Sequence, residues 1–193
     1  GCTSLKSATL MDGITQMESS VFENCTALTT LTVPDTLKSS NYGVSCSQPE
    51  NGTLPGITLC ATADSTSVTE PMVSIVRGRM TEFKFTDSIT AIGDETFKDC
   101  DDLLTMVVPD TIKTIGNSAF YDCDGLTELT LPSELEKIPE SMVYQCSSLK
   151  TIKIPETVTD IGNSAFARCD ALQTAEIPAN AKTLGSSLFA DCT

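Results

Sequence analysis

The chain has 193 residues, with 26 acidic and 12 basic side chains and neither His nor Trp. A net charge of −14 argues against nucleic acids and anionic membranes as partners, because binding to phosphate needs a surplus of Lys and Arg. The absence of His removes the most common general base and metal ligand, and no apolar run is long enough to insert directly into a membrane.

Residues 1–39 contain the first units of a repeat. Cys2 is matched one unit later by Cys25, and Phe22 precedes the second of them. A strand-like series of apolar residues that ends in a proline then follows, and the same series recurs further along the chain. Its members are Leu28, Leu31, Val33, Pro34 and Leu37.

Residues 40–68 depart from this pattern. The position equivalent to Cys25 next falls at Arg77, six residues beyond the point that two further units would reach. The stretch is therefore either an irregular insertion or one degenerate repeat with six extra residues, and its Ser, Thr, Gly, Asn and Pro content is typical of loops. It contains Cys46 and Cys60, which break the period. We predict a disulfide between them, with two free thiols as the alternative.

Residues 69–91 form a worn unit. Met80, Phe83, Phe85 and Ile89 keep apolar strand positions, whereas Ser74 and Arg77 replace the usual Phe and Cys.

From residue 92 onward the 23-residue period is regular. One unit reads I-G-x-x-A-F-x-x-C-x-x-L-x-x-I-x-I-P-x-x-V-x-x, with Pro139 once in place of glycine and Val143 once in place of phenylalanine. Such a period indicates a solenoid, and we treat residues 1–193 as a single one. The repeated cysteines are Cys100, Cys123, Cys146, Cys169 and Cys192, and the repeated phenylalanines are Phe97, Phe120, Phe166 and Phe189.

Each unit predicts one short strand and one return segment. The L-x-x-I-x-I-P series alternates with a period of two, so residues such as Leu149, Ile152 and Ile154 should point inward. Successive strands should pair in parallel, with right-handed connections. The I-G-x-x-A-F-x-x-C segment should form the outer wall as helical turns or coil, with glycine allowing a tight turn or a positive φ.

The motif A-F-x-x-C-x-x-L-x-x-I-x-I-P resembles the bacterial cell-surface type of leucine-rich repeat, the Treponema-type or BspA-like family. The resemblance covers about 160 residues. It implies an α/β-type leucine-rich repeat solenoid with short parallel strands on its concave face. It also implies a secreted or surface-attached protein, usually part of a longer modular chain, with roles in adhesion and in binding host or matrix proteins.

The remaining seven cysteines all lie at the repeat position that faces the core. Because seven is odd, complete pairing is impossible, and we expect buried thiols that pack as small apolar groups.

Acidic residues also fall in register beside these cysteines. Asp99, Asp101, Asp122 and Asp124 could stack their carboxylates and hold calcium. The D-x-D-x-D-G loop spacing is missing, however, and Asp also favours turns, where it accepts hydrogen bonds from nearby backbone N–H groups. We therefore favour surface turns, with calcium as the alternative.

The outward residues of the strands should line the concave face and form the binding surface. This face is rich in threonine and has no aromatic anchor, although interface hot spots favour Trp, Tyr and Arg. The candidates are Glu82, Lys84, Thr105, Val107, Glu128, Thr130, Thr151, Lys153, Thr174 and Glu176.

These features predict a non-enzymatic binding module at the cell surface or outside the cell, with a protein partner. The alternative is a structural spacer within a larger surface protein. An enzyme ranks third, because the chain has no His, no C-x-x-C, no G-x-S-x-G and no glycine-rich phosphate loop, and we expect no cofactor. Both ends of the sequence fall inside a repeat, so we expect a fragment of a longer chain, with end-to-end self-association as a further possibility.

Overall fold

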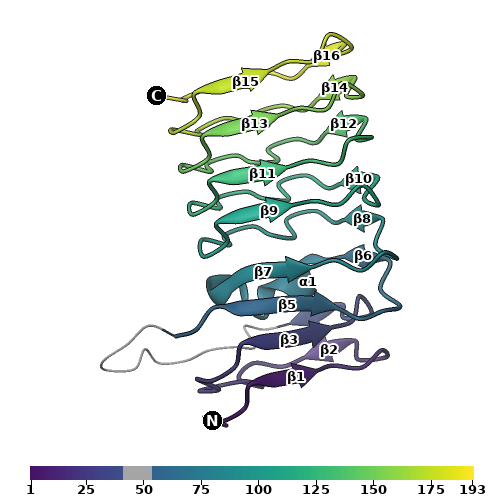
Figure 1. The fold of residues 1–193 in the computed structure, drawn as a ribbon, viewed down its shortest axis with the longest axis vertical. Coiled ribbons are helices and arrows are strands. Elements are labelled where there is room, and N and C mark those ends of the chain that lie inside the picture. Colours follow the sequence, from purple (N-terminus) through teal and green to yellow (C-terminus); the bar gives the residue numbers. More distant parts are fainter. Residues whose placement is uncertain (41–53) are drawn as a thin grey trace.

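The computed structural model describes residues 1–40 and 54–193, which wind as a solenoid with the two termini at opposite ends (Figure 1). Each turn contributes one strand to a main face and a second, two-residue strand to a neighbouring row. The main strands are β1 (Ser7–Thr9), β3 (Thr30–Val33), β5 (Ile57–Ala61), β7 (Met80–Lys84), β9 (Thr105–Val107), β11 (Glu128–Thr130), β13 (Thr151–Lys153) and β15 (Thr174–Glu176). The short strands are β2 (Gln16–Met17), β4 (Ser39–Ser40), β6 (Ser67–Val68), β8 (Ala91–Ile92), β10 (Thr114–Ile115), β12 (Lys137–Ile138), β14 (Asp160–Ile161) and β16 (Thr183–Leu184).

All strand pairs are parallel, and their register reproduces the sequence period. Glu128 of β11 pairs with Thr105 of β9 on one side and Thr151 of β13 on the other, each one period away. Because one full turn of chain separates paired residues, equivalent side chains of successive turns stack in rows. The predicted leucine-rich repeat solenoid with a 23-residue period is therefore confirmed.

Within residues 40–68, the described part follows the solenoid path. β5 pairs with β3 and β7, and Thr30 pairs with Thr58, five residues later than the period requires. The sixth extra residue is Thr81 of β7, which forms a bulge, because Ile57 pairs with Met80 whereas its neighbour Thr58 pairs with Glu82. Five of the six extra residues therefore precede β5, and one lies in β7. Residues 41–53, which include Cys46, lie outside the described residues.

Neither row of strands is continuous. The main strands form two sheets, β1–β3–β5–β7 and β9–β11–β13–β15, and the short strands form three, β2–β4, β6–β8–β10 and β12–β14–β16. The interruption between β10 and β12 has a local cause at Pro139. Gly116 N–H donates to Ile92 O over 2.9 Å and Gly162 N–H to Ile138 O over 2.8 Å. Proline at the equivalent position has no N–H to donate to the preceding turn.

The wall behind the strands contains little helix. Helix α1 (Glu70–Ser74) and the 3-10 turn Arg77–Arg79 are the helices of the described residues, both in the worn unit. Turns and coil form the rest of the wall, so the helical alternative of the sequence prediction is wrong outside this unit. The reason is that wall backbone groups bond to the next turn, as Phe97 N–H does to Ala119 O over 2.7 Å, instead of within a helix.

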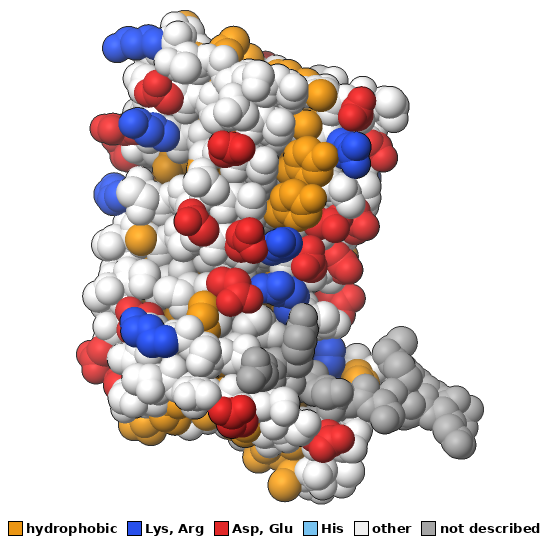
Figure 2. Space-filling model, turned by 180° about the vertical axis from the view of Figure 1, so that it is seen from behind, with side chains coloured by type: hydrophobic (Ala, Val, Ile, Leu, Met, Phe, Trp, Pro, Cys, Tyr) orange, Lys and Arg blue, Asp and Glu red, His pale blue; other side chains and the backbone are white. Residues whose placement is uncertain are grey.

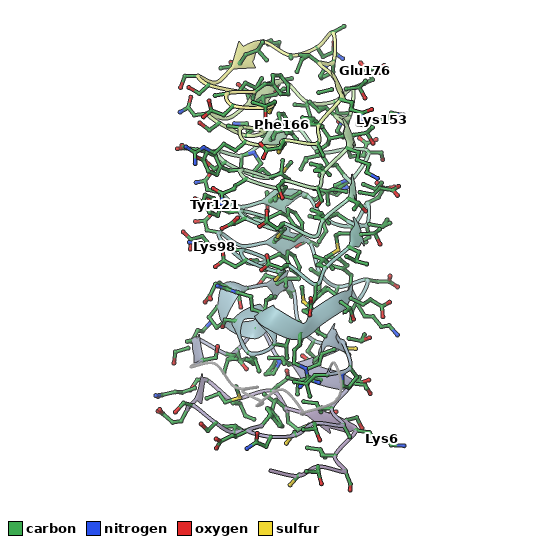
Figure 3. The ribbon with its side chains drawn as sticks, turned by 90° about the vertical axis from the view of Figure 1, so that its left-hand side faces the viewer. Lys6, Lys98, Tyr121, Lys153, Phe166 and Glu176 are labelled. Atoms are coloured by element: carbon green, nitrogen blue, oxygen red, sulfur yellow. The ribbon has the colours of Figure 1, made fainter. Side chains whose placement is uncertain are left out.

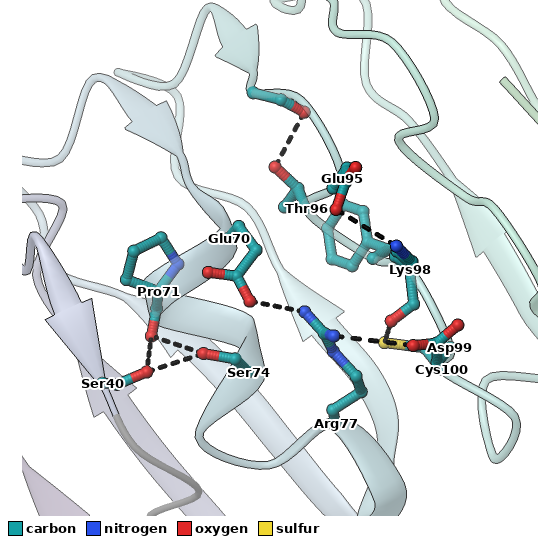
Figure 4. Close-up of polar contacts among 12 residues, drawn as sticks. Ser40, Glu70, Pro71, Ser74, Arg77, Glu95, Thr96, Lys98, Asp99 and Cys100 are labelled. Carbon is teal, nitrogen blue, oxygen red and sulfur yellow. Dashed lines mark hydrogen bonds and ion pairs between the residues drawn. The ribbon is translucent and has the colours of Figure 1, made fainter. Parts of the chain in front are cut away.

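Arg77 replaces a ladder cysteine with an ion pair that joins two turns. Its guanidinium donates to Glu70 Oε1 over 2.7 Å and lies 3.7 Å from Asp99 Oδ2 in the following turn (Figure 4). Ser40 donates to Pro71 O over 2.9 Å and so connects α1 to the preceding turn. At the ladder position the worn unit therefore makes an ion pair with the next turn, whereas regular units such as that of Cys123 place a buried thiol there.

The glycine row is required by close packing between turns, and of the two alternatives, a tight turn or a positive φ, the positive φ does not occur in this row. A Cβ on Gly116 would lie 2.4 Å from Asp94 N, and one on Gly162 would lie 2.5 Å from Glu140 N. Non-glycine residues adopt the positive φ instead, two in each regular unit, such as Ser118 at 54° and Asp122 at 55°. Glycine thus allows the turns to approach, while polar residues make the left-handed bends.

The core is one continuous cluster beneath both rows. Phe97 and Phe120 are fully buried and stack at 5.1 Å between ring centroids, and Phe166 stacks on Phe189 at 5.4 Å. The inward positions predicted for the strands are buried, with Leu149 at 0%, Ile152 at 4% and Ile154 at 3% exposure. The phenylalanine row therefore forms the predicted spine.

The ladder cysteines do more than fill space. Cys123 Sγ donates to Phe97 O over 2.9 Å, Cys146 Sγ to Phe120 O over 3.0 Å and Cys169 Sγ to Val143 O over 3.1 Å. Each thiol satisfies a buried carbonyl of the preceding turn, which explains a cysteine where alanine would leave an acceptor unpaired. The inward position holds for the middle of the ladder, whereas Cys2 is exposed and Cys192 is half-buried.

We expect stability to fall in alkaline solution because these thiols must stay protonated. Burial raises the pKa of Cys169 to about 12 from an ordinary value of 9.0, and the pKa of Cys100 is raised for the same reason. Above the unfolded-state pKa the unfolded chain binds fewer protons, so stability is complete below it and is lost as the pH rises from about 9 toward 12. Urea unfolding of reduced protein between pH 8 and 11 should show a loss of at most ~1.4 kcal/mol per pH unit for each such thiol. A Cys169→Ala variant should lose less with pH than the wild type. Parallel pH profiles for the two would contradict the assignment.

Candidate functional site

The main face of β9–β15 presents the predicted binding residues to solvent. Met106, Leu129 and Ile152 point into the core, and the residues on either side of each are exposed. Lys153 and Glu176 lie side by side, because β13 and β15 pair at this position, and both project from the same side of the molecule (Figure 3). The exposed candidates in this sheet are Thr105, Val107, Glu128, Thr130, Thr151, Lys153, Thr174 and Glu176.

Glu82 and Lys84 are also exposed, but they belong to the other main sheet. Thr58 Oγ1 donates to Glu82 Oε2 over 3.0 Å. Cys60 pairs in register with Lys84 and faces outward, half-buried, so it does not belong to the core ladder. Burial raises the pKa of its thiol, although nearby Lys84 opposes the shift. No disulfide joins two of the described cysteines, and the pairing with Cys46 remains a prediction.

An open groove of about 580 Å³ crosses the main face over β11 and β13. Thr130, Thr151 and Lys153 contribute polar groups to it, and Leu131 and Pro155 contribute apolar surface. A concave region with mixed polar and apolar walls suits a protruding side chain of a partner. The groove therefore gives the predicted binding surface a recess of defined shape.

A second groove, of about 610 Å³, follows the interruption in the short row. Ile115, Ile138 and Pro139 line it with Asp160 at one side. Hydrogen bonds from Thr159 and Thr183 lower the pKa of the Asp160 carboxyl, so this side of the groove carries a negative charge at neutral pH. The charged side chains that line this groove have both signs, so they favour neither an anionic nor a cationic ligand.

The acidic row beside the cysteines serves as turns. Asp99 and Asp122 adopt left-handed backbone conformations, both with φ near 55°. Asp122 Oδ1 accepts a hydrogen bond from Gln145 Nε2 over 2.8 Å, and Asp124 Oδ1 accepts one from Ser147 Oγ over 2.7 Å. Partial burial raises the pKa of Asp101, and the neighbouring aspartates raise it further.

These hydrogen bonds and backbone conformations are the ones that the turn interpretation predicts, and the calcium alternative stays a prediction. Among residues 1–40 and 54–193, no group of three or more His, Cys, Asp or Glu side chains is arranged to hold a metal ion. Asp110, which follows the proline after β9, also accepts a backbone hydrogen bond, from Ser133 N–H to its Oδ1 over 2.7 Å.

A stacked pair of tyrosines on the wall was not predicted from the sequence. Tyr121 and Tyr144 are one period apart and stack at 5.0 Å with nearly parallel rings. Lys98 Nζ lies 5.3 Å from the first ring centre, and Arg168 Cζ lies 5.7 Å from the second, so a cation covers each end of the stack. The shared spacing of the two tyrosines was the signal that could have revealed this arrangement.

Comparison with known proteins identifies the repeat. A sequence family described as the BspA type leucine rich repeat region matches residues 1–57 and 77–193, in six copies. The chain belongs to the BspA-type leucine-rich repeat family. The gap in the match, residues 58–76, covers the end of the irregular segment and the start of the worn unit, where α1 lies. The chain matches none of the curated proteins.

Solved bacterial leucine-rich repeat proteins share the fold of this BspA-type chain. A leucine-rich repeat protein from Bacteroides ovatus is 20% identical, with a TM-score of 0.66 over 93% of this chain and 48% of its own. The leucine-rich repeat protein of T. pallidum is 19% identical, with a TM-score of 0.57 over 86% of this chain and 78% of its own. One from Eubacterium ventriosum is 15% identical, with a TM-score of 0.59 over 94% and 69%. The BspA-type chain thus spans about half the length of the Bacteroides ovatus protein.

In the described part of this BspA-type chain, no helix is both long and apolar enough to cross a membrane.

Proposed function

We propose that this chain is a non-enzymatic binding module, secreted or held at the cell surface, which binds a protein partner through its main face. The observation that carries the proposal is the in-register face of β9–β15, where the groove over β11 and β13 gives a defined place for contact. Membership of the BspA-type family supports a binding or structural repeat module.

The chemistry of this face suits a polar protein surface. Threonine hydroxyls both donate and accept hydrogen bonds, and Glu128 and Lys153 add one charge of each sign beside the groove. Val107 is 69% exposed and supplies an apolar contact at the edge of the same sheet. Because strand pairing already fixes the backbone of this face, binding would not have to order the backbone as well as the side chains.

Binding to a panel of purified, immobilised extracellular-matrix proteins tests this proposal. Thr130→Glu together with Thr151→Glu places two charges in the groove and should weaken any interaction at least about tenfold, because an unpaired charge is costly in an interface. Thr15→Glu with Thr90→Glu makes the same chemical change at exposed positions beside the short row and should leave affinity unchanged. Equal affinities of both double variants for a ligand of the wild type would remove the main face from the proposal.

A structural spacer is the second candidate, and one observation favours it. None of the outward residues predicted on the main face is Trp, Tyr, Phe or Arg, the types that usually supply interface hot spots. A spacer would bind none of the panel proteins, and its groove variants would behave as the wild type in every assay.

A further inference from the structure

The tyrosine stack lies on the wall, away from the main face. Lys98 and Tyr121 project from one side of the solenoid, whereas Lys153 and Glu176 project from the other (Figure 3). Viewed from behind, the molecule shows a short strip of hydrophobic side chains with acidic and basic side chains along its borders (Figure 2). Tyr121 and Tyr144 are both partly exposed.

The repeat itself does not require these aromatic rings. The equivalent position is Lys98 in the turn before the stack, and Ala167 and Ala190 in the two turns after it. All of these turns have the same backbone pattern, including the interturn bond that Arg168 N–H donates to Ala190 O over 2.8 Å. Since alanine suffices to build the wall, a stacked pair of half-exposed tyrosines adds apolar surface that the fold does not use.

The charge around the stack is unbalanced. The cations are already paired, Lys98 with Glu95 at 3.3 Å and Arg168 with Asp191 at 3.6 Å. No basic side chain of the described residues lies within ion-pair distance of the remaining carboxylates, which are Asp101, Asp102, Asp122, Asp124 and Asp170. Asp124 and Asp170 also line an open polar groove of about 520 Å³ together with Arg168. The wall therefore presents apolar ring edges beside surplus negative charge.

We propose that Tyr121, Tyr144 and the adjoining aspartates form a second docking surface, which binds an extended, basic segment of a partner protein. Arg or Lys side chains of the segment would lie against the unpaired carboxylates, and their aliphatic stems would pack on the tyrosine edges. Three residues of extended chain cover ~10 Å, close to the ~9.6 Å of two solenoid turns. Asp124 and Asp170 are two periods apart, so basic residues three positions apart in the segment match their separation.

Tyrosine fluorescence gives a direct readout, because the chain has no Trp and only three Tyr. In a Tyr42→Phe background, all emission comes from Tyr121 and Tyr144. The probe is the blocked decapeptide Arg-Leu-Gly-Arg-Leu-Gly-Arg-Leu-Gly-Arg, with a matched peptide in which Gln replaces each Arg. We expect a saturable change in emission with the arginine peptide, weakened at least about threefold at 0.5 M salt by charge screening. A response of equal size to the glutamine peptide, or none to either peptide, would overturn the proposal.

Matched variants locate the binding. Asp122→Asn with Asp124→Asn should weaken the arginine peptide about three- to tenfold, and asparagine tolerates the left-handed backbone at residue 122. Glu134→Gln with Glu136→Gln changes the net charge equally at exposed positions elsewhere and should have no such effect. Equal losses in the two variants would show that only the overall charge attracts the peptide.

Three further measurements separate this surface from the main face and from a cation site. The double variant Tyr121→Ala with Tyr144→Ala should bind the arginine peptide at least about tenfold more weakly. Its binding is measured with a fluorescently labelled peptide, and its folding is checked by circular dichroism. Thr130→Glu with Thr151→Glu, on the main face, should leave peptide binding unchanged, so the two proposals can fail independently. Calcium chloride alone should not alter tyrosine emission. A calcium response without a peptide response would mean a cation site instead of a protein-binding surface.

Discussion

Phe120→Ala is expected to lower the free energy of unfolding by about 3–5 kcal/mol, the range for buried Phe truncations. The ring is fully buried, and it stacks on Phe97 at 5.1 Å in the middle of the spine. Turns on both sides enclose the resulting cavity, so the chain cannot collapse into it without disturbing the interturn hydrogen bonds. Equilibrium unfolding in urea, followed by circular dichroism, measures the loss.

Phe189→Ala is the matched control, since it removes the same side chain from the same row. Phe189 is 37% exposed and stacks on Phe166 alone, so less apolar surface is lost and water can fill the space. Its loss should be clearly smaller than that of Phe120→Ala. Similar losses at the two positions would contradict a stack whose stability comes from neighbouring turns.

Gly116→Ala is expected to destabilise the chain by about 1–3 kcal/mol, the cost of overpacking, although it adds one methyl group. That methyl would lie 2.4 Å from Asp94 N and 2.5 Å from Gly93 C, both backbone atoms of the preceding turn. Relief requires the two turns to separate, which would weaken the bond from Gly116 N–H to Ile92 O. The thermal midpoint and the urea midpoint should both fall.

Gly78→Ala provides the comparison, because a Cβ at Gly78 meets nothing within 4 Å and the residue has no positive φ. The general gain in helix propensity and the loss of chain entropy in the unfolded state should make this variant neutral or slightly stabilising. If Gly116→Ala proved as harmless as Gly78→Ala, close approach between turns would not explain the glycine row.

The sequence predicted the residues of the main face but not the tyrosine stack on the wall. The alternation of Thr151, Ile152 and Lys153 was enough to assign their faces, because a strand places successive side chains on opposite sides. Lys98, Tyr121 and Tyr144 share one repeat position, so their row was readable from the spacing, whereas the contact of Arg168 with this row needed the structure. Arg168 comes directly after the position that is equivalent to Tyr144 in the next turn, and only the path of the wall brings its guanidinium over that ring.

The sequence by itself determined the repeat, its strands and its spine. An identical spacing of cysteine, phenylalanine and proline forces equivalent residues into register once the chain coils, so core positions such as Phe97 and Leu149 follow from the period alone. Each regular unit packs against a unit of nearly the same sequence, so the residues that the local pattern marks as inward are also the ones buried between turns.

Only the tertiary structure showed where the chain accommodates the residues that depart from this period. It divided the six extra residues between the segment before β5 and the bulge at Thr81 of β7, and it separated β10 from β12 at Pro139. It also chose coil with bonds between turns over the helical turns that the sequence left open for the wall. The physical reason is the same in each case. These features depend on which backbone groups of adjacent turns come into contact. The residues involved are about one period or more apart, so the sequence of a single unit does not determine them.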